Sequence, residues 1–264
     1  MKKIVITNNK GGVGKTATAV TLASLMKRRG YRVLLVDADS QGNSTKWYNA
    51  KVYDTNTLYD LILAKEQEKA SDCIQHTESG DIIAGGRPLE DADVILSSFM
   101  AGEMRLKYAL EDIDDMYDYC IIDTHTGLNK LEKSALLTAN ALIVPLEATK
   151  SSIDGLVSII NAANEVRRYN NDLTYIGAVI TKANVRTNMY KEALQGLQDN
   201  MDKFGYKMYS TPVRHGSAVS EAETLHETLD RYLKHAVGRK SKMKPLDDYN
   251  VICDEIINDI GWGR

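Results

Sequence analysis

The stretch NNKGGVGKT at residues 8–16 constrains the fold more than any other feature of this chain. It follows a short β-branched run, KIVIT at 3–7, and it opens a helical pattern from Lys15 to Arg29 that Gly30 ends. A glycine-rich turn between a strand and a helix points backbone N–H groups inward and adds the positive end of the helix dipole. We therefore expect a phosphate-binding loop at the carboxyl end of the first strand.

Strand-like and helix-like patterns alternate along the rest of the chain, and the strand patterns are continuously apolar. This arrangement predicts an α/β fold with a mostly parallel sheet and helices on both faces. Ser151 and Ser220 each fit the first position of a capping box. Further strands are expected at 32–37, 119–123, 141–146 and 173–181, and helices near 56–68, 100–112, 128–140, 151–168, 187–203, 220–236 and 246–260.

Composition excludes several classes of protein. The net charge is −3, so any nucleic-acid binding must come from a local basic patch. Three scattered cysteines fit neither a disulfide framework nor a zinc site, which favours a reducing cytoplasm. The chain has no apolar run as long as a membrane span. We expect one domain over 1–264, without an N-terminal helix-turn-helix domain because the first strand begins at Lys3.

The loop also fits a dinucleotide fingerprint. Gly12, Gly14 and Ala17 have the spacing G-x-G-x-x-A, and Asp37 ends the next strand at a suitable distance to hold a ribose. Such a fingerprint is weak when it stands alone. It also gives no role to the Lys-Thr pair that follows Gly14.

A nucleoside triphosphate accounts for that pair. Lys15 would contact the β- and γ-phosphates, and the Thr16 hydroxyl would ligate Mg²⁺. The apolar run YCIID ends at Asp123, as a Walker B strand ends in an aspartate. We therefore favour a nucleoside triphosphatase over a dinucleotide-binding protein.

A second lysine makes the motif specific. The usual phosphate loop has glycine where this chain has Asn9, and Lys10 follows. KGGVGKT at 10–16 is the deviant Walker A motif, and nearly the whole chain resembles the ParA/Soj branch of the ParA/MinD P-loop ATPases. The resemblance implies that Lys10 crosses a dimer interface to the other subunit's phosphates, so that two subunits enclose two ATP molecules. A solvated lysine beside an ordinary loop is the alternative.

The resemblance also assigns roles to other residues. By the match of RVLLVDADSQGNST at 32–45, Asp39 would orient the attacking water, and by YDYCIIDTHTG at 117–127, Asp123 would hold Mg²⁺ through water. The implied catalytic residues are Lys10, Lys15 and Asp39. The implied metal residues are Thr16, Asp37 and Asp123. The implied ATP contacts are Lys10, Gly11, Gly12, Val13, Gly14, Lys15, Thr16, Ala17, Lys182, Pro212 and Arg214.

Three positions depart from the family pattern. Ser40 stands where proline usually follows the second aspartate, and His125 and Thr126 stand where two prolines usually follow the Walker B strand. The late segment PVRHGSAVSEA keeps only Arg214 of the usual arginines. We expect slow hydrolysis, and we expect His125 to make a structural hydrogen bond in the switch loop.

The resemblance implies a DNA-partitioning ATPase that binds DNA non-specifically as an ATP dimer and is stimulated by a ParB-like centromere-binding protein. The segment RYLKHAVGRKSKMK at 231–244 is basic and contains no acidic residue, which suits phosphate contacts, although a solvated helix end is the simpler interpretation. The expected DNA contacts are Arg186, Arg214, Arg231, Lys234, Arg239, Lys240 and Lys242.

Other functions in the superfamily are less consistent with the sequence. A MinD-like ATPase acting on a membrane or protein cargo would need a basic amphipathic C-terminal helix, whereas the polar residues of 246–260 are acidic. That helix is expected to pack on the domain. An iron–sulfur reductase would need interface cysteines, and a tyrosine kinase would need a C-terminal tyrosine cluster.

Overall fold

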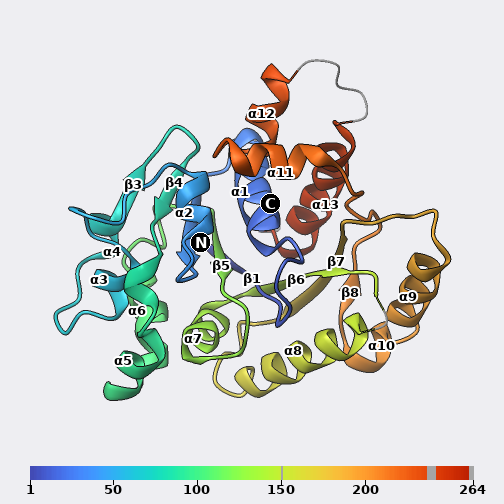
Figure 1. Cartoon of the computed structure of the whole chain (residues 1–264). Helices are drawn as coiled ribbons and strands as arrows, with labels where there is room; N and C mark the ends of the chain where they lie inside the picture. Colours follow the sequence, from blue (N-terminus) through green and yellow to red (C-terminus); the bar gives the residue numbers. More distant parts are fainter. Residues whose placement is uncertain (150, 237–241, 262–264) are drawn as a thin grey trace.

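An eight-stranded sheet forms the centre of the computed structural model, which describes residues 1–149, 151–236 and 242–261 (Figure 1). The strand order is β3-β4-β2-β5-β1-β6-β7-β8, and every neighbouring pair is parallel except β3 and β4. The predicted α/β fold with a mostly parallel sheet is therefore confirmed. The strands are β1 Lys2–Ile6, β2 Val33–Ala38, β3 Ile74–His76, β4 Asp81–Ile83, β5 Tyr119–Thr124, β6 Ala141–Glu147, β7 Tyr175–Thr181 and β8 Lys207–Met208.

Helices cover both faces of the sheet (Figure 1). On one face lie α1, α11, α12 and α13, and on the other lie α7 and α8, with α3, α5 and α6 continuing that layer beside α7. The helices are α1 Lys15–Arg28, α2 Asn43–Trp47, α3 Leu58–Ile62, α4 Ala70–Cys73, α5 Ala92–Ser98, α6 Arg105–Glu111, α7 Lys130–Thr138, α8 Ser152–Val166, α9 Asn188–Gln198, α10 Met201–Phe204, α11 Ser217–Thr224, α12 Leu229–His235 and α13 Lys244–Ile260.

The apolar strand residues divide between two cores. In β1, Ile4 and Ile6 pack toward α1, while Val5 packs toward the opposite layer, and all three are fully buried. Successive side chains of a strand point to opposite faces, so a strand covered on both faces must be apolar at every position. This requirement explains why the strand patterns are unbroken in the sequence.

Both expected capping boxes are wrong. Ser151 precedes α8 but its side chain caps nothing among the described residues, and Ser220 lies inside α11, which already begins at Ser217. Helix α11 starts a turn early because Ala218 and Ala222 share its buried face. A left-handed His226 then separates α11 from α12, so the single helix expected at 220–236 is two.

The helix expected at 56–68 is shorter, since α3 ends at Ile62. Its true capping box joins Thr57 and Asp60. The predictions did not include the edge strand β3, its neighbour β4 or the short helices α2, α4 and α5. These elements span three to seven residues each, too few for periodicity to identify them.

Helix α13 packs on α1, as expected for the acidic C-terminal helix. Ile252 and Ile256 are fully buried, the Tyr249 hydroxyl lies 3.0 Å from Thr18 Oγ1, and Arg29 pairs with Asp254 at 2.7 Å. In the part of the chain that the structure describes, no helix has the length and apolar character to cross a membrane.

Candidate active site

The phosphate loop joins β1 to α1 in a conformation that depends on glycine. Gly12 and Gly14 have φ of +74° and +83°, in the left-handed region that other residues rarely adopt. Gly14 is also the N-cap of α1, and no side chain of the described residues caps that helix. The N–H groups of the first turn are therefore available to an anion.

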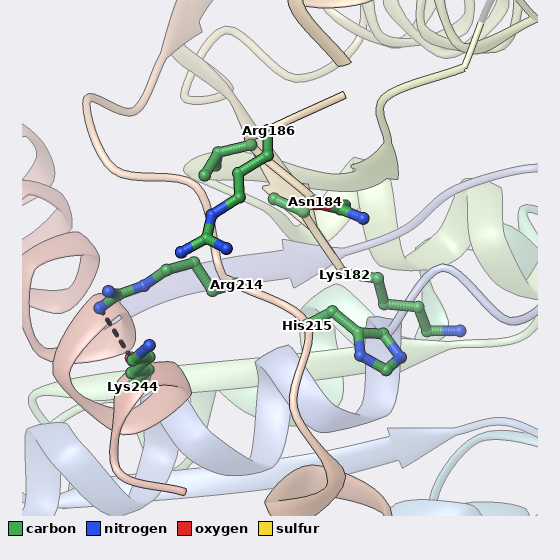
Figure 2. A pocket seen from close by; sticks show the side chains of 8 residues that line it. Lys182, Asn184, Arg186, Arg214, His215 and Lys244 are labelled. Atoms are coloured by element: carbon green, nitrogen blue, oxygen red, sulfur yellow. Dashed lines mark hydrogen bonds between the residues drawn. The ribbon is translucent and has the colours of Figure 1, made fainter. Parts of the chain in front are cut away.

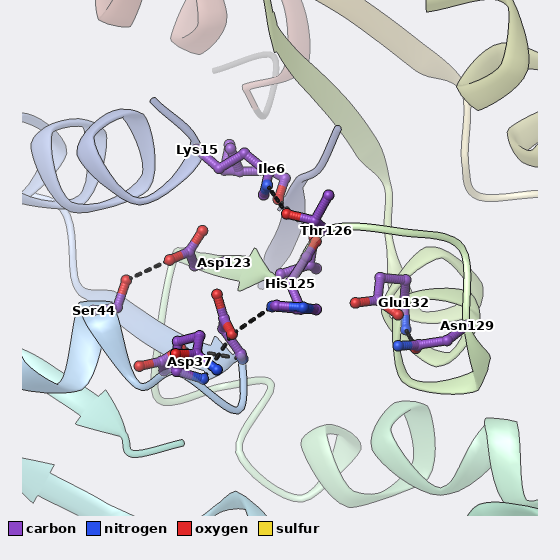
Figure 3. A network of polar contacts seen from close by, with 12 residues as sticks. Ile6, Lys15, Asp37, Ser44, Asp123, His125, Thr126, Asn129 and Glu132 are labelled. Carbon is purple, nitrogen blue, oxygen red and sulfur yellow. Dashed lines mark hydrogen bonds and ion pairs between the residues drawn. The ribbon is translucent and has the colours of Figure 1, made fainter. Parts of the chain in front are cut away.

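The two loop lysines differ in surroundings. Lys15 is buried, and its Nζ lies 3.1 Å from Thr126 Oγ1 in the loop after β5 and 3.5 Å from the Lys10 carbonyl oxygen (Figure 3). Burial lowers the pKa of Lys15, and nearby carboxylates, Asp123 first, act in the opposite direction. Lys10 is exposed, and within the described ranges its ammonium group makes neither a hydrogen bond nor an ion pair.

Two buried carboxylates lie side by side beyond the loop. The register of β2 and β5 places Asp37 opposite Asp123, and neither is exposed. Asp37 accepts hydrogen bonds from Thr45 N and Oγ1 at 2.7 and 2.6 Å. Ser44 Oγ donates to Asp123 Oδ2 at 2.8 Å, whereas Asp123 Oδ1 is buried without a hydrogen-bond partner in the described chain.

This pair fits a divalent cation. Burial raises the pKa of Asp37 to about 6 and that of Asp123 to about 8; the Asp37 carboxylate adds to the rise at Asp123, and the Asp39 carboxylate adds to the rise at Asp37. A cation would remove this penalty and supply the missing partner of Asp123 Oδ1. The Thr16 side chain, in the first turn of α1, acts to lower the pKa of Asp123. A site with one or two carboxylates and one hydroxyl suits Mg²⁺, because Mg²⁺ usually keeps water molecules and phosphate oxygens as its remaining ligands.

Asp39 begins the loop after β2 and faces the phosphate loop. Its Oδ1 accepts from the Gln41 N–H at 2.8 Å and lies 2.8 Å from His125 Nδ1. The expected hydrogen bond of His125 is therefore present, and it joins the loops after β2 and β5.

Glu132 is a buried acid that the sequence predictions missed. It is fully buried at the start of α7, and its two carboxylate oxygens have no hydrogen-bond partner within the described residues. Burial raises its pKa to about 7, and His125 acts in the opposite direction. One signal was available, because Leu128, Glu132 and Leu136 share one face at helical spacing, so the acid interrupts an apolar stripe.

Several residues of the phosphate loop and of the loops after β2 and β5 line one cavity of about 330 Å³. Of the expected ATP contacts, Gly12, Gly14, Lys15, Thr16, Ala17 and Lys182 line it, together with Asp39 and His125. Gly11 lies opposite Thr126: a side chain at position 11 would place its Cβ 3.9 Å from Thr126 Oγ1. Val13 is buried, and its carbonyl accepts from Thr181 Oγ1 at 2.7 Å.

A larger cavity of about 690 Å³ lies beside the first, with Lys182 common to both. Figure 2 shows basic side chains around it: Lys182, Arg186, Arg214, His215 and Lys244. Lys182 Nζ reaches the Gly12 carbonyl at 2.5 Å. Pro212 is partly buried. The next residue, Val213, donates its N–H to the Ile180 carbonyl oxygen at 2.7 Å. The structure thus brings the late sequence segments to the phosphate loop.

The expected DNA contacts differ in whether an acidic side chain already pairs with them. Arg214 holds Asp248 through Nε and Nη2 at 2.6–3.1 Å. Arg231 pairs with Glu78 at 2.7 Å, and Lys242 pairs with Glu221 at 2.6 Å. Arg186 is exposed and makes no such contact in the described part of the chain. Lys234 is exposed on α12, and Arg239 and Lys240 lie outside the described residues.

Known proteins resemble the chain in sequence. A family model described as an AAA domain matches residues 1–175. The sporulation initiation inhibitor protein Soj of Bacillus subtilis is 34% identical over 225 residues, which cover 84% of this chain and 87% of Soj. The chromosome partitioning protein ParA of Caulobacter vibrioides is 30% identical over 247 residues, which cover 92% of this chain and 92% of ParA. The chain therefore belongs to the ParA/MinD family of P-loop ATPases.

Solved structures share the fold. McdA of Cyanothece superposes with a TM-score of 0.81 at 22% identity, covering 94% of this chain and 98% of McdA. The cell division ATPase MinD of Pyrococcus furiosus gives a TM-score of 0.74 at 21% identity, covering 97% and 98%. At these identities the likeness supports the fold alone.

Proposed function

We propose that this protein is a partitioning ATPase that dimerises around Mg-ATP, binds DNA non-specifically as the dimer and dissociates after hydrolysis. The observation that carries the proposal is the contrast between the two lysines of one loop. Lys15 points inward to the cavity, whereas Lys10 is exposed and has no partner among the described residues. A second subunit's phosphates would give Lys10 the partner that its own chain does not supply.

The site residues would divide the chemistry of phosphoryl transfer. The loop N–H groups and Lys15 would hold the β- and γ-phosphates, and Thr16 with Asp123 would hold Mg²⁺, which neutralises charge on the transferred group. Asp39 would orient the attacking water, and Lys10 of the second subunit would stabilise the transition state. Hydrolysis would be slow without a ParB-like partner, so that the ATP dimer lives long enough to act as a switch.

The second cavity would serve the base and the DNA. Lys182 joins both cavities, which supports a nucleotide running from the phosphate loop toward Pro212 and Arg214. Arg186 and Lys244, on the rim, carry charges that bind no acidic group in the described chain and would contact DNA phosphates. The nucleoid would then be the surface on which the ATP dimer collects.

A gel shift with a random-sequence duplex tests the proposal. Asp39→Ala should trap the ATP dimer, so this variant should shift DNA only with Mg-ATP. Adding Lys10→Ala should abolish both the shift and the ATP-dependent dimer seen by light scattering, with nucleotide binding retained. Lys65→Ala, at an exposed lysine after α3, is the matched control. A dimer that forms equally well in the Lys10 variant would refute the role of Lys10.

An ATP-dependent dimer that leaves DNA unshifted would remove DNA as the surface. Binding to anionic liposomes would then test the MinD-like alternative. That alternative has little physical support in α13, because its apolar residues are buried against α1 and its exposed side includes Asp254.

A further inference from the structure

The orientation of Asp39 depends on a residue outside its own loop. Its Oδ1 receives the Gln41 N–H and the His125 imidazole, both at 2.8 Å, and since an ionised carboxylate only accepts, Nδ1 carries the hydrogen. Two donors on one oxygen fix the plane of the carboxylate. Within the described ranges no hydrogen bond reaches Oδ2, which leaves this oxygen to accept from a water molecule.

Glu132 lies beside the His125 ring (Figure 3). Its carboxylate is fully buried, and in the described chain neither oxygen has a hydrogen-bond partner. An unpartnered buried carboxylate costs several kcal/mol of folding free energy. Packing alone would favour leucine here, since Leu136, one turn further along α7, is fully buried in the apolar core. The ring of His125 therefore lies between two carboxylates that come from different elements.

The loop that carries His125 has little else to hold it. Gly127 has φ of +132° and empty space around the position of a Cβ. Thr126 contacts Lys15 Nζ at 3.1 Å, and Lys15 must turn to phosphate when a nucleotide binds. Among the described residues, the contact between His125 and Asp39 would then be the remaining side-chain hydrogen bond between the loops after β5 and β2.

We propose that His125 is a positioning residue for hydrolysis, holding the Asp39 carboxylate in the orientation that aligns the attacking water, with Glu132 steadying the imidazole from the other side. This inference rests on the proposed ATPase function. It assigns His125 no contact with ATP, so its effect should appear in turnover and not in nucleotide affinity.

The His125→Ala variant tests whether His125 affects turnover and leaves nucleotide affinity unchanged. The variant should lower kcat roughly 10- to 100-fold, the range expected when a water-orienting group is misplaced, and should change affinity for a fluorescent ATP analogue less than about twofold. His125→Asn, whose Nδ2–H can replace Nδ1–H, should recover most of the loss. The control is His235→Ala, an exposed histidine at the end of α12.

A double-mutant cycle separates this role from a general structural one. Because His125 would act through Asp39, His125→Ala should add no further loss to Asp39→Asn. An additive loss, an unchanged kcat in His125→Ala, or equal changes in kcat and affinity would overturn the inference. If Asp39→Asn abolishes turnover while His125→Ala has no effect, the inference fails and the ATPase function stands. A wild type without ATP hydrolysis would refute both.

A measurement on the nucleotide-free protein needs no turnover. The imidazole ¹⁵Nδ1 resonance of His125, assigned with His125→Ala, should shift in Asp39→Asn, where the acceptor charge is removed, and in Glu132→Gln. A resonance that neither substitution moves would show that the imidazole is not held between the two carboxylates.

Discussion

Two charged regions of this molecule differ in how their charges are partnered. Around the phosphate loop, Asp123 Oδ1 and both oxygens of Glu132 are buried without hydrogen-bond partners in the described residues. Around α11–α13, two basic side chains are neutralised by acids from neighbouring segments: Arg214 pairs with Asp248, and Lys242 pairs with Glu221. Burying unpaired carboxylate oxygens costs folding free energy in the first region, and a bound ligand can relieve that cost. The ion pairs of the second region carry almost no such cost.

The difference shows why a run of basic residues in the sequence does not by itself identify a DNA-binding surface. Arg231 is adjacent to other cations along the chain, but in space it lies against Glu78 from the turn before β4. A phosphate would have to displace that acid. Arg186 stands alone in the sequence and is exposed in the structure, with no acidic partner among the described residues.

The largest expected effect is on nucleotide affinity. Lys15→Ala should weaken ATP binding by about a thousandfold, or about 4 kcal/mol, because the variant removes the buried charge that is proposed to contact the phosphates. Arg231→Ala, which removes a surface charge already paired with Glu78, should change affinity less than about twofold. Titration of a fluorescent ATP analogue would measure both. Similar losses of ATP affinity in the two variants would show that the buried and the surface charges do not differ in their effect on nucleotide binding.

The next effect is on stability and depends on pH. The pKa of Glu132 is raised to about 7 in the folded protein, above its ordinary value of 4.5, so the folded state binds this proton more tightly. Stability is therefore lost as pH rises from about 4.5 through 7. Glu132→Gln should be more stable than wild type by about 3 kcal/mol above pH 8 and equal to it near pH 4.

Urea unfolding without nucleotide would measure this difference, with Glu221→Gln as the surface counterpart. The pKa of Glu221 is lowered to about 2, first by its hydrogen bond with Lys242, so its contribution has the opposite sign. It is present above about pH 4.5 and is lost as pH falls toward 2. Loss of stability in both variants at pH 8 would mean that Glu132 is paired in solution.

The smallest expected effect is on DNA binding. Arg186→Ala should weaken binding of the ATP dimer by about 1 kcal/mol and reduce the slope of log K against log salt by about 1, since one phosphate contact is lost. Arg231→Ala should leave the slope unchanged. Fluorescence anisotropy at several salt concentrations would measure both slopes. A larger change for Arg231 would move the DNA surface toward α12.

Much of the sheet and the phosphate loop could be predicted because their patterns are local. Residues 4–6, which lead into the phosphate loop, are apolar at every position, and Lys15 begins α1 where the motif predicts it. The acidic partner of Arg214 could not be predicted, because Asp248 lies 34 residues away in the chain and no pattern joins them. Glu132 was missed because an acid in the first turn of a helix ordinarily faces solvent.

The register of the two central strands has a consequence for how the gene can change. Asp37 faces Asp123 across β2 and β5, and Ala38 faces Thr124. Because side chains alternate between the faces of a strand, a single inserted or deleted codon within either strand would turn one carboxylate to the wrong side of the sheet. We therefore expect length variation in the loops and at the β3–β4 edge, where the segments between elements can grow without shifting the two carboxylates.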